Sequence, residues 1–274
     1  MHKDGSMCKK AVRAVEGDIV MDASLAKQLI IICPLTLLGG FLDASSGGGG
    51  LISLPAYMFA GLNSHSAVAT YKLSSAMGTS VAALRMAKDG HIQWSKAWPC
   101  MAVAAAGSVI GAGLAIHTSE RVLGHIMLIV IPVTAFYILK TQNLDSQDHE
   151  LKKSGFRVRS ATIAFLISVY DGLYGPGTGT FIILLMSRFA GCTLLESVGL
   201  SRAILLATNI SALIVFLVKG KVVICLGIAG GAAGIIGNLL GVSLVRDKGN
   251  NAVKPLMIIV LIIAFIKIAS ESMM

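Results

Sequence analysis

Two glycine-rich runs, each preceded by an aspartate, are the stretches of this sequence best suited to chemistry. Asp43 lies four residues before the four consecutive glycines Gly47–Gly50, and Asp171 lies four residues before the run Gly175–Gly179. Each run interrupts long apolar sequence. Inside a bilayer, a broken helix is tolerated only where its freed backbone groups are buried in protein or line a wet cavity. Two such breaks at matching positions indicate a binding site within the membrane.

The glycines suit an anionic ligand. If each run ends one half-helix and begins another, the second half-helix presents unpaired N–H groups and the positive end of its dipole. Glycine has no Cβ, so a ligand can approach the backbone closely. Thr178, inside the second run, adds a hydroxyl. The other uses of such glycines are close helix packing and a plain hinge.

Two cations fall inside apolar segments, where an unpaired charge is costly and usually functional. Lys72 and Arg202 lie 130 residues apart, and Asn209 follows Arg202 by two helical turns. These side chains are expected to hold an anion. In the alternatives, the cations snorkel to the membrane surface or neutralise Asp43 and Asp171 in structural ion pairs.

The two acids are candidates for coupling sites, because a carboxylate beside unwound backbone can bind a proton or a sodium ion. The alternatives are an N-cap for the following half-helix and a partner for the cations. The expected solute-binding residues are therefore Gly47, Gly48, Gly49, Gly50, Lys72, Gly175, Gly177, Thr178, Gly179, Arg202 and Asn209, and the expected ion-coupling residues are Asp43 and Asp171.

The composition is that of a membrane protein. Of 274 residues, 55% are hydrophobic and 14% charged, and the mean hydropathy is +0.78. The net charge of +9 lies between apolar segments rather than in one basic stripe, which excludes nucleic acid as a partner. The five cysteines have no metal-ligand spacing, and no nucleophile–base motif or phosphate loop is present. We expect no metal, no cofactor and no enzymatic activity.

The apolar segments form two sets of five, separated by a polar connection. We expect an all-α, polytopic helical bundle of two repeats, each with a glycine-broken first helix. Its parts are a cytoplasmic tail (1–24), a first membrane repeat (25–140), a polar linker (141–159) and a second membrane repeat (160–274). The pairs Gly107/Gly111 and Gly237/Gly241, also 130 residues apart, place two small residues on one helix face, as helix contacts in membranes do.

The distribution of lysine and arginine predicts the topology. If each glycine break lies inside one continuous span, the basic residues gather strongly on the side that holds both termini. This favours eight spans, in two parallel repeats of four, with both termini in the cytoplasm. Ten full crossings, with a weaker charge bias, are the alternative.

The sequence resembles the TauE/SafE sulfite exporter family. The resemblance rests on Gly40–Asp43 with Gly47–Pro55, on Ala69–Ser75, on Tyr170–Phe181, and on Thr208–Ala212 with Gly220–Val222. It implies an integral membrane carrier of sulfite, sulfonates and related sulfur-containing anions. Tyr71 departs from the Thr-Asn-Lys pattern of its relatives, and replaces an amide with a bulky phenol.

The expected function is secondary transport of a small anion, such as sulfite or an organosulfonate, bound between the two broken helices and moved by alternating access. In the alternative, a cation-coupled or channel-like protein binds the ion at Asp43 and Asp171. A membrane scaffold without transport is a third class, and it predicts that the glycine breaks tolerate alanine. The expected partners are the solute, the bilayer of the bacterial inner membrane, a coupling proton or sodium ion, and a second copy in a homodimer.

Overall fold

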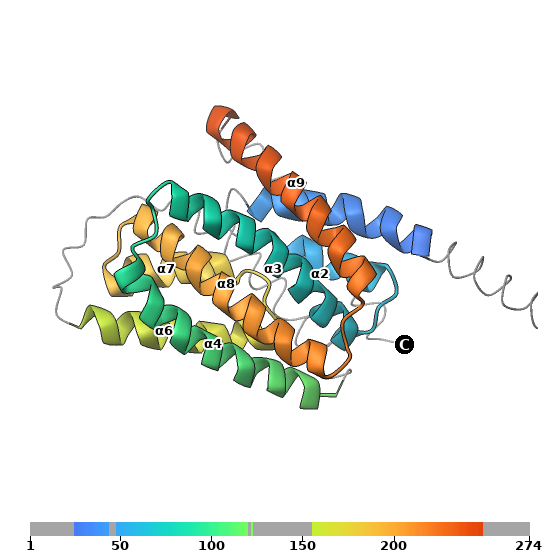
Figure 1. Ribbon diagram of the computed structural model, residues 1–274, viewed down its shortest axis with the longest axis horizontal. Helices are drawn as coiled ribbons and strands as arrows, with labels where there is room; N and C mark the ends of the chain where they lie inside the picture. Colours follow the sequence, from blue (N-terminus) through green and yellow to red (C-terminus); the bar gives the residue numbers. More distant parts are fainter. Residues whose placement is uncertain (1–24, 44–47, 120–121, 123–154, 249–274) are drawn as a thin grey trace, which may run out of the picture.

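The structure, a computed structural model, describes residues 25–43, 48–119, 122 and 155–248, and these residues are helical apart from short loops (Figure 1). The all-α prediction is confirmed. The expected tail 1–24, residues 141–154 of the linker and the last apolar segment lie outside the described residues. The helices are Leu25–Asp43, α2 (Gly50–Phe59), α3 (Ser64–Lys88), α4 (Trp94–His117), α6 (Phe156–Leu173), α7 (Thr178–Ala190), α8 (Leu194–Val218) and α9 (Ile224–Lys248).

Three of the described helices are long and apolar enough to cross a membrane: Leu25–Asp43, α4 and the Leu195–Val218 part of α8. Large apolar side chains on α4, α8 and α9 point out of the bundle, as lipid contact requires. They include Val109, Ile110, Leu114, Ile210, Ile214, Leu217, Ile228 and Ile236. The protein is therefore a helical bundle of the membrane-embedded type.

Both glycine runs break their helices as predicted. The N-terminal helix ends at Asp43 and α2 begins at Gly50. In the second half, α6 ends at Leu173 and α7 begins at Thr178.

The chain reverses direction at the first break. The Gln28 side-chain amide donates to the Ala60 carbonyl over 3.1 Å, which places the start of the N-terminal helix beside the end of α2. Nearer the turn, Gly39 lies against Gly49 and Ser53. The N-terminal helix and α2 therefore form an antiparallel hairpin, which we call the first hairpin.

The second break also reverses the chain. At the turn, the Tyr170 hydroxyl donates to the Pro176 carbonyl over 2.7 Å, and the Tyr170 ring lies 6.0 Å from that of Phe181. At the far end, Phe156 packs in the same apolar cluster as Ala190. Helices α6 and α7 form the second hairpin.

The expectation of a continuous span through each break is therefore wrong, because a glycine run frees the backbone to turn back as readily as to continue. The parallel arrangement of the two halves is wrong as well. Helices α3 and α8, each 25 residues long, are antiparallel: the Thr70 hydroxyl near the start of α3 accepts from the Val223 N–H beyond the end of α8. At the other end, the His91 carbonyl lies against Gly199 near the start of α8.

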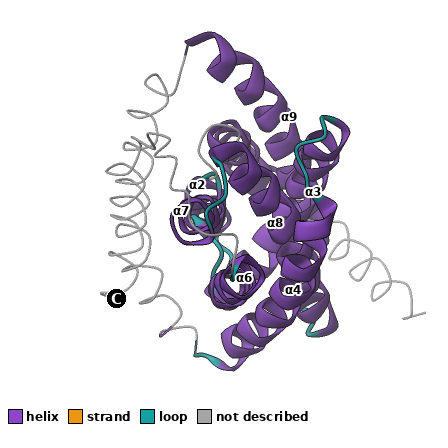
Figure 2. Ribbon diagram, turned by 90° about the vertical axis from the view of Figure 1, so that its left-hand side faces the viewer, coloured by secondary structure: helices purple, strands orange, loops and turns teal. Residues whose placement is uncertain are grey.

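The hairpins enter the bundle from opposite ends. One apolar cluster joins the open end of the first hairpin to the start of α3 and the end of α8, through residues such as Leu25, Val68 and Phe216. The other joins the open end of the second hairpin to the loop after α3, through Ile92 and Ala190. Figures 1 and 2 together show α2 and α7 roughly end to end, and the two hairpin tips meet in the middle of the bundle.

Glycines allow the close approach of helices from different halves. A methyl group at Gly111 of α4 would overlap the Val169 carbonyl of α6, and one at Gly237 of α9 would overlap the Leu37 carbonyl of the N-terminal helix. Thus α4 packs on the first helix of the second half, and α9 on the first helix of the first half. This crossed packing holds both hairpins against long helices.

Candidate binding site between the hairpin tips

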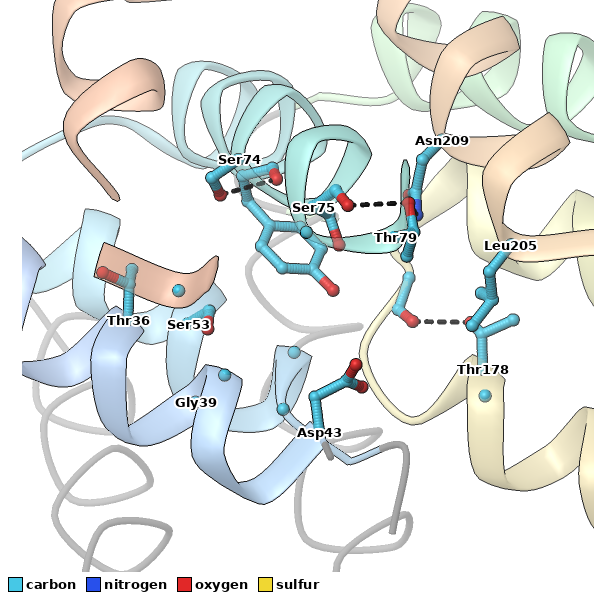
Figure 3. Close-up of a pocket in the computed structure, with 18 of the residues that line it drawn as sticks. Thr36, Gly39, Asp43, Ser53, Ser74, Ser75, Thr79, Thr178, Leu205 and Asn209 are labelled. Carbon is cyan, nitrogen blue, oxygen red and sulfur yellow. Dashed lines mark hydrogen bonds between the residues drawn. The ribbon is translucent and has the colours of Figure 1, made fainter. Parts of the chain in front are cut away.

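A cavity of about 60 Å³ lies where the two hairpin tips meet (Figure 3). This volume has room for roughly four to six water molecules. Its lining comes from both hairpins and from α3, α8 and α9: Thr36, Gly39, Gly40, Asp43, Gly49, Gly50, Ser53, Tyr71, Ser74, Ser75, Gly78, Thr79, Asp171, Gly175, Gly177, Thr178, Gly179, Leu205, Asn209, Gly230, Gly234 and Asn238.

Glycine is required at the tips for two different reasons. In the second hairpin, Gly175 and Gly177 have φ values of 103° and 82°, which side chains rarely adopt. In the first hairpin, a methyl group at Gly50 would overlap the Tyr71 hydroxyl and lie 3.1 Å from the Pro176 Cα atom. The tips therefore touch each other through glycine.

The N-termini of α2 and α7 both open toward the cavity. Gly50, the first residue of α2, and Thr178 and Gly179, the first residues of α7, line it. The dipole of each helix adds partial positive charge at this end. The N–H groups of Leu51, Ile52 and Thr178 already donate to tip carbonyls, so those of Gly50 and Gly179 are the ones that can serve a ligand. Two such ends facing one cavity make it favourable for negative charge.

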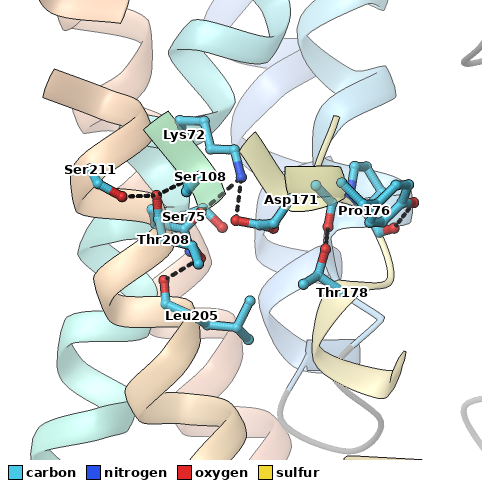
Figure 4. A network of polar contacts seen from close by, with 12 residues as sticks. Lys72, Ser75, Ser108, Asp171, Pro176, Thr178, Leu205, Thr208 and Ser211 are labelled. Carbon is cyan, nitrogen blue, oxygen red and sulfur yellow. Dashed lines mark hydrogen bonds and ion pairs between the residues drawn. The ribbon is translucent and has the colours of Figure 1, made fainter. Parts of the chain in front are cut away.

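A buried ion pair stands beside the second tip (Figure 4). The Lys72 ammonium on α3 donates to the Asp171 carboxylate over 2.8 Å and to the Asn209 amide oxygen over 3.2 Å. The Lys72 side chain is fully buried and that of Asp171 is 2% exposed. Lys72 therefore does not snorkel to a membrane surface.

A second ion pair stands beside the first tip. The Arg202 guanidinium on α8 donates to the Asp43 carboxylate over 2.6 Å and to the Asp43 main-chain carbonyl over 2.8 Å. The second of these bonds satisfies a carbonyl at the C-terminus of the N-terminal helix, which has no partner within the helix. Each cation thus pairs with the acid of the other half of the chain.

The acids line the cavity, whereas the two cations lie behind them. Of the residues expected to bind solute or ion, the structure brings nine to the lining: Asp43, Gly49, Gly50, Asp171, Gly175, Gly177, Thr178, Gly179 and Asn209. Lys72 and Arg202 are not in the lining: Lys72 contacts the lining residues Asp171 and Asn209, and Arg202 contacts Asp43. Gly48 is buried outside the lining, and Gly47 lies outside the described residues.

Several lining residues were not predicted from the sequence. They are hydroxyl and amide side chains on helices that border the tips, namely Thr36, Ser53, Ser74, Ser75 and Asn238. A usable signal existed for Asn238, because it is an isolated amide within an apolar segment. Among the described residues, no group of three or more histidine, cysteine, aspartate or glutamate side chains is placed to hold a metal ion.

Apolar membrane helices around a cavity lined by helix breaks are the arrangement of a membrane transporter, and comparison with known proteins agrees. The profile described as "Sulfite exporter TauE/SafE" matches residues 32–268. The chain belongs to the TauE/SafE family of membrane transporters. No solved structure was found to match it.

Named relatives are described as transporters and not as enzymes. "Probable membrane transporter protein ORF9" of Sinorhizobium sp is 32% identical over 234 residues, which cover 85% of this chain and 89% of the relative. "Probable membrane transporter protein YfcA" of Escherichia coli K12 is 29% identical over 254 residues, covering 89% and 94%. A "Probable membrane transporter protein" of Haemophilus influenzae is 26% identical over 239 residues, covering 87% and 93%.

Proposed function

We propose that this transporter carries a small sulfur-containing anion, such as sulfite or an organosulfonate, bound in the cavity between the hairpin tips. The observation that carries the proposal is the meeting of the N-termini of α2 and α7 at one cavity. The N–H groups of Gly50 and Gly179 donate to the anion, and the Ser53 hydroxyl adds a further donor. The Thr178 hydroxyl donates to the Gly175 carbonyl and so holds the second tip in shape.

The two ion pairs allow an anion to bind in a cavity that is lined by two carboxylates. Asp43 and Asp171 face the cavity, and their charges would repel the solute if they were unpaired. Arg202 and Lys72 cancel these charges. The solute therefore meets a site whose fixed charges sum to zero and whose remaining dipoles are positive.

Transport follows an alternating-access cycle in which the halves move against each other around the cavity. The hairpins enter the bilayer from opposite faces of the bacterial inner membrane, so each can gate one side. The protein is multi-pass. The cytoplasmic placement of both termini stays a prediction, because residues 1–24 and 249–274 lie outside the described residues. The coupling ion and the homodimer also stay predictions.

Flux measurements in proteoliposomes test the proposal. We expect wild-type protein to carry labelled sulfite or taurine, and Gly50→Ala to abolish that flux, because the added methyl group forces the tips apart. Gly113→Ala is the matched control, since a methyl group there meets open space on α4. Absence of flux in the wild type, or full flux in Gly50→Ala, would contradict the proposal. The latter result is the one a non-transporting scaffold predicts.

One observation favours a second candidate, a cation-coupled or channel-like protein. The cavity lining contains both carboxylates and neither cation, and oxygen atoms are the ligands that hard cations bind. In that case, flux should depend on sodium, and the reversal potential should follow the cation gradient. Flux that follows the anion gradient in sodium-free medium would exclude it.

A further inference from the structure

The two ion pairs of the site differ in their solvent exposure and in the number of side chains that hold the cation. Lys72 is held by two partners, the Asp171 carboxylate and the Asn209 amide oxygen, in a region with almost no solvent access. The Asp43 side chain, in contrast, is 25% exposed beside an Arg202 side chain that is 8% exposed. Water and protons can therefore reach Asp43 far more readily than Asp171.

The partner of Asp43 cannot lose its charge. A guanidinium stays protonated in proteins, whereas a carboxylate can take up a proton. Both side-chain bonds from Arg202 go to Asp43, one to the carboxylate and one to the main-chain carbonyl. If the carboxylate is protonated, the guanidinium loses its counter-charge next to the cavity and can accept another anion. Its planar fork fits an oxyanion well.

We propose that Asp43 is the proton-coupling residue of this transporter, and that Arg202 is the cation that exchanges the Asp43 carboxylate for the solute anion. Lys72 and Asp171 form a fixed pair that keeps its partners throughout the cycle. This inference rests on the proposed anion transport and deepens it, because it distinguishes the roles of two pairs that the sequence presents as equivalent.

The exchange conserves charge. One proton adds to a carboxylate oxygen of Asp43, and one monovalent anion takes the place of that carboxylate on the guanidinium. When the anion leaves, Asp43 releases its proton and pairs with Arg202 again. Proton and anion therefore move together, and an occupied site has the same net charge as an empty one.

The surroundings of Asp43 contain few other groups that could carry the proton. Among the described residues that line the cavity, α3 contributes Tyr71 and α6 contributes Asp171, which is paired with Lys72. Helices α2, α7 and α9 contribute glycine, hydroxyl and amide groups to the lining, none of which titrates near neutral pH. Asp43 is thus the accessible carboxyl group of the site.

Sulfonate accumulation driven by a proton gradient tests this assignment in proteoliposomes of the full chain. The probe is labelled methanesulfonate, which is a monovalent anion on both sides of the membrane, whereas sulfite titrates near neutral pH and would distribute unequally across a pH gradient by itself. In the wild type, an inward proton gradient should raise internal methanesulfonate several-fold above equilibrium, with proton entry reported by an internal pH dye. Asp43→Asn cannot carry a proton, so methanesulfonate should equilibrate across the membrane and the accumulation ratio should fall to one.

Asp171→Asn is the matched control. We expect less folded protein and a lower rate, because Lys72 loses its buried partner, but a proton-driven accumulation ratio above one. Wild-type accumulation in Asp43→Asn, or loss of accumulation in Asp171→Asn with retention in Asp43→Asn, would overturn the assignment and leave anion transport intact. Absence of both sulfite and methanesulfonate flux in the wild type would overturn the proposed function together with this inference.

Infrared difference spectra keep the test decisive if Asp43→Asn does not fold. Adding sulfite to the wild type should produce the carbonyl band of a protonated carboxyl group. That band should shift in Asp43→Glu and stay in place in Asp171→Glu. A band that shifts in Asp171→Glu alone, or no band at all, would contradict the proposal.

Discussion

The side-chain amide of Asn209 on α8 donates to the Thr79 hydroxyl on α3 over 3.5 Å, and these residues are 130 positions apart in the chain. The same offset separates Lys72 from Arg202 and the start of α3 from the start of α8. A contact between residues at matching positions is what a two-fold relation between the halves would produce. It lies at the cavity, beside the Lys72–Asp171 pair.

The hairpin at the first break can be tested by cross-linking. In a chain without its native cysteines, Gln28→Cys and Ala60→Cys should be joined by a short bifunctional thiol reagent, because these residues lie side by side. A helix that continued straight from residue 28 to residue 60 would hold them roughly 48 Å apart. Efficient cross-linking within one chain, read as a mobility shift after proteolysis, supports the hairpin. A control with one cysteine should show no shift.

The Lys72–Asp171 pair should behave as a coupled unit in stability. Lys72→Ala leaves a buried carboxylate without its cation, which typically costs about 3–5 kcal/mol. The double variant Lys72→Met/Asp171→Leu removes both charges and should recover much of this loss. Thermal unfolding in detergent measures both effects. Additive losses in the double variant would show that the two side chains do not depend on each other.

Tyr71 should limit the size of the solute. Its hydroxyl lies against Gly50 at the first tip, and its ring lies against Gly175 at the second. Tyr71→Asn removes the ring that lies between the two tips. The solute preference of transport should therefore move from sulfite toward sulfonates with longer tails. Competition of a series of alkyl sulfonates against sulfite flux measures the change. Tyr57→Phe, a change to a buried tyrosine of α2 outside the cavity lining, should leave the order unchanged.

The sequence predicted the helical class, the two breaks and nine of the residues that line the cavity, because glycine runs and charges are conspicuous within apolar segments. It did not predict the reversal of the chain between Asp43 and Gly50. Glycine permits many directions, and contacts over 32 residues, such as Gln28 to Ala60, select one of them. The sequence also did not predict that each cation pairs with the acid of the other half. Lys72 and Asp171 are 99 residues apart, and Arg202 and Asp43 are 159 apart.

Close packing of α4 on α6 should depend on Gly111. A methyl group there overlaps the Val169 carbonyl, and overpacking of this kind typically costs about 1–3 kcal/mol. Gly111→Ala should therefore lower the unfolding temperature in detergent, whereas Gly113→Ala on the same helix meets open space and should not. Equal unfolding temperatures for the two variants would contradict this packing.

The most direct measurement is a structure of the protein determined with sulfite bound in a lipid nanodisc. The account predicts sulfite between the hairpin tips, within hydrogen-bonding distance of the first N–H groups of α2 and α7, with Lys72 still paired to Asp171. A sodium ion coordinated by Asp43 and Asp171 in that cavity, or sulfite bound elsewhere on the protein, would contradict it.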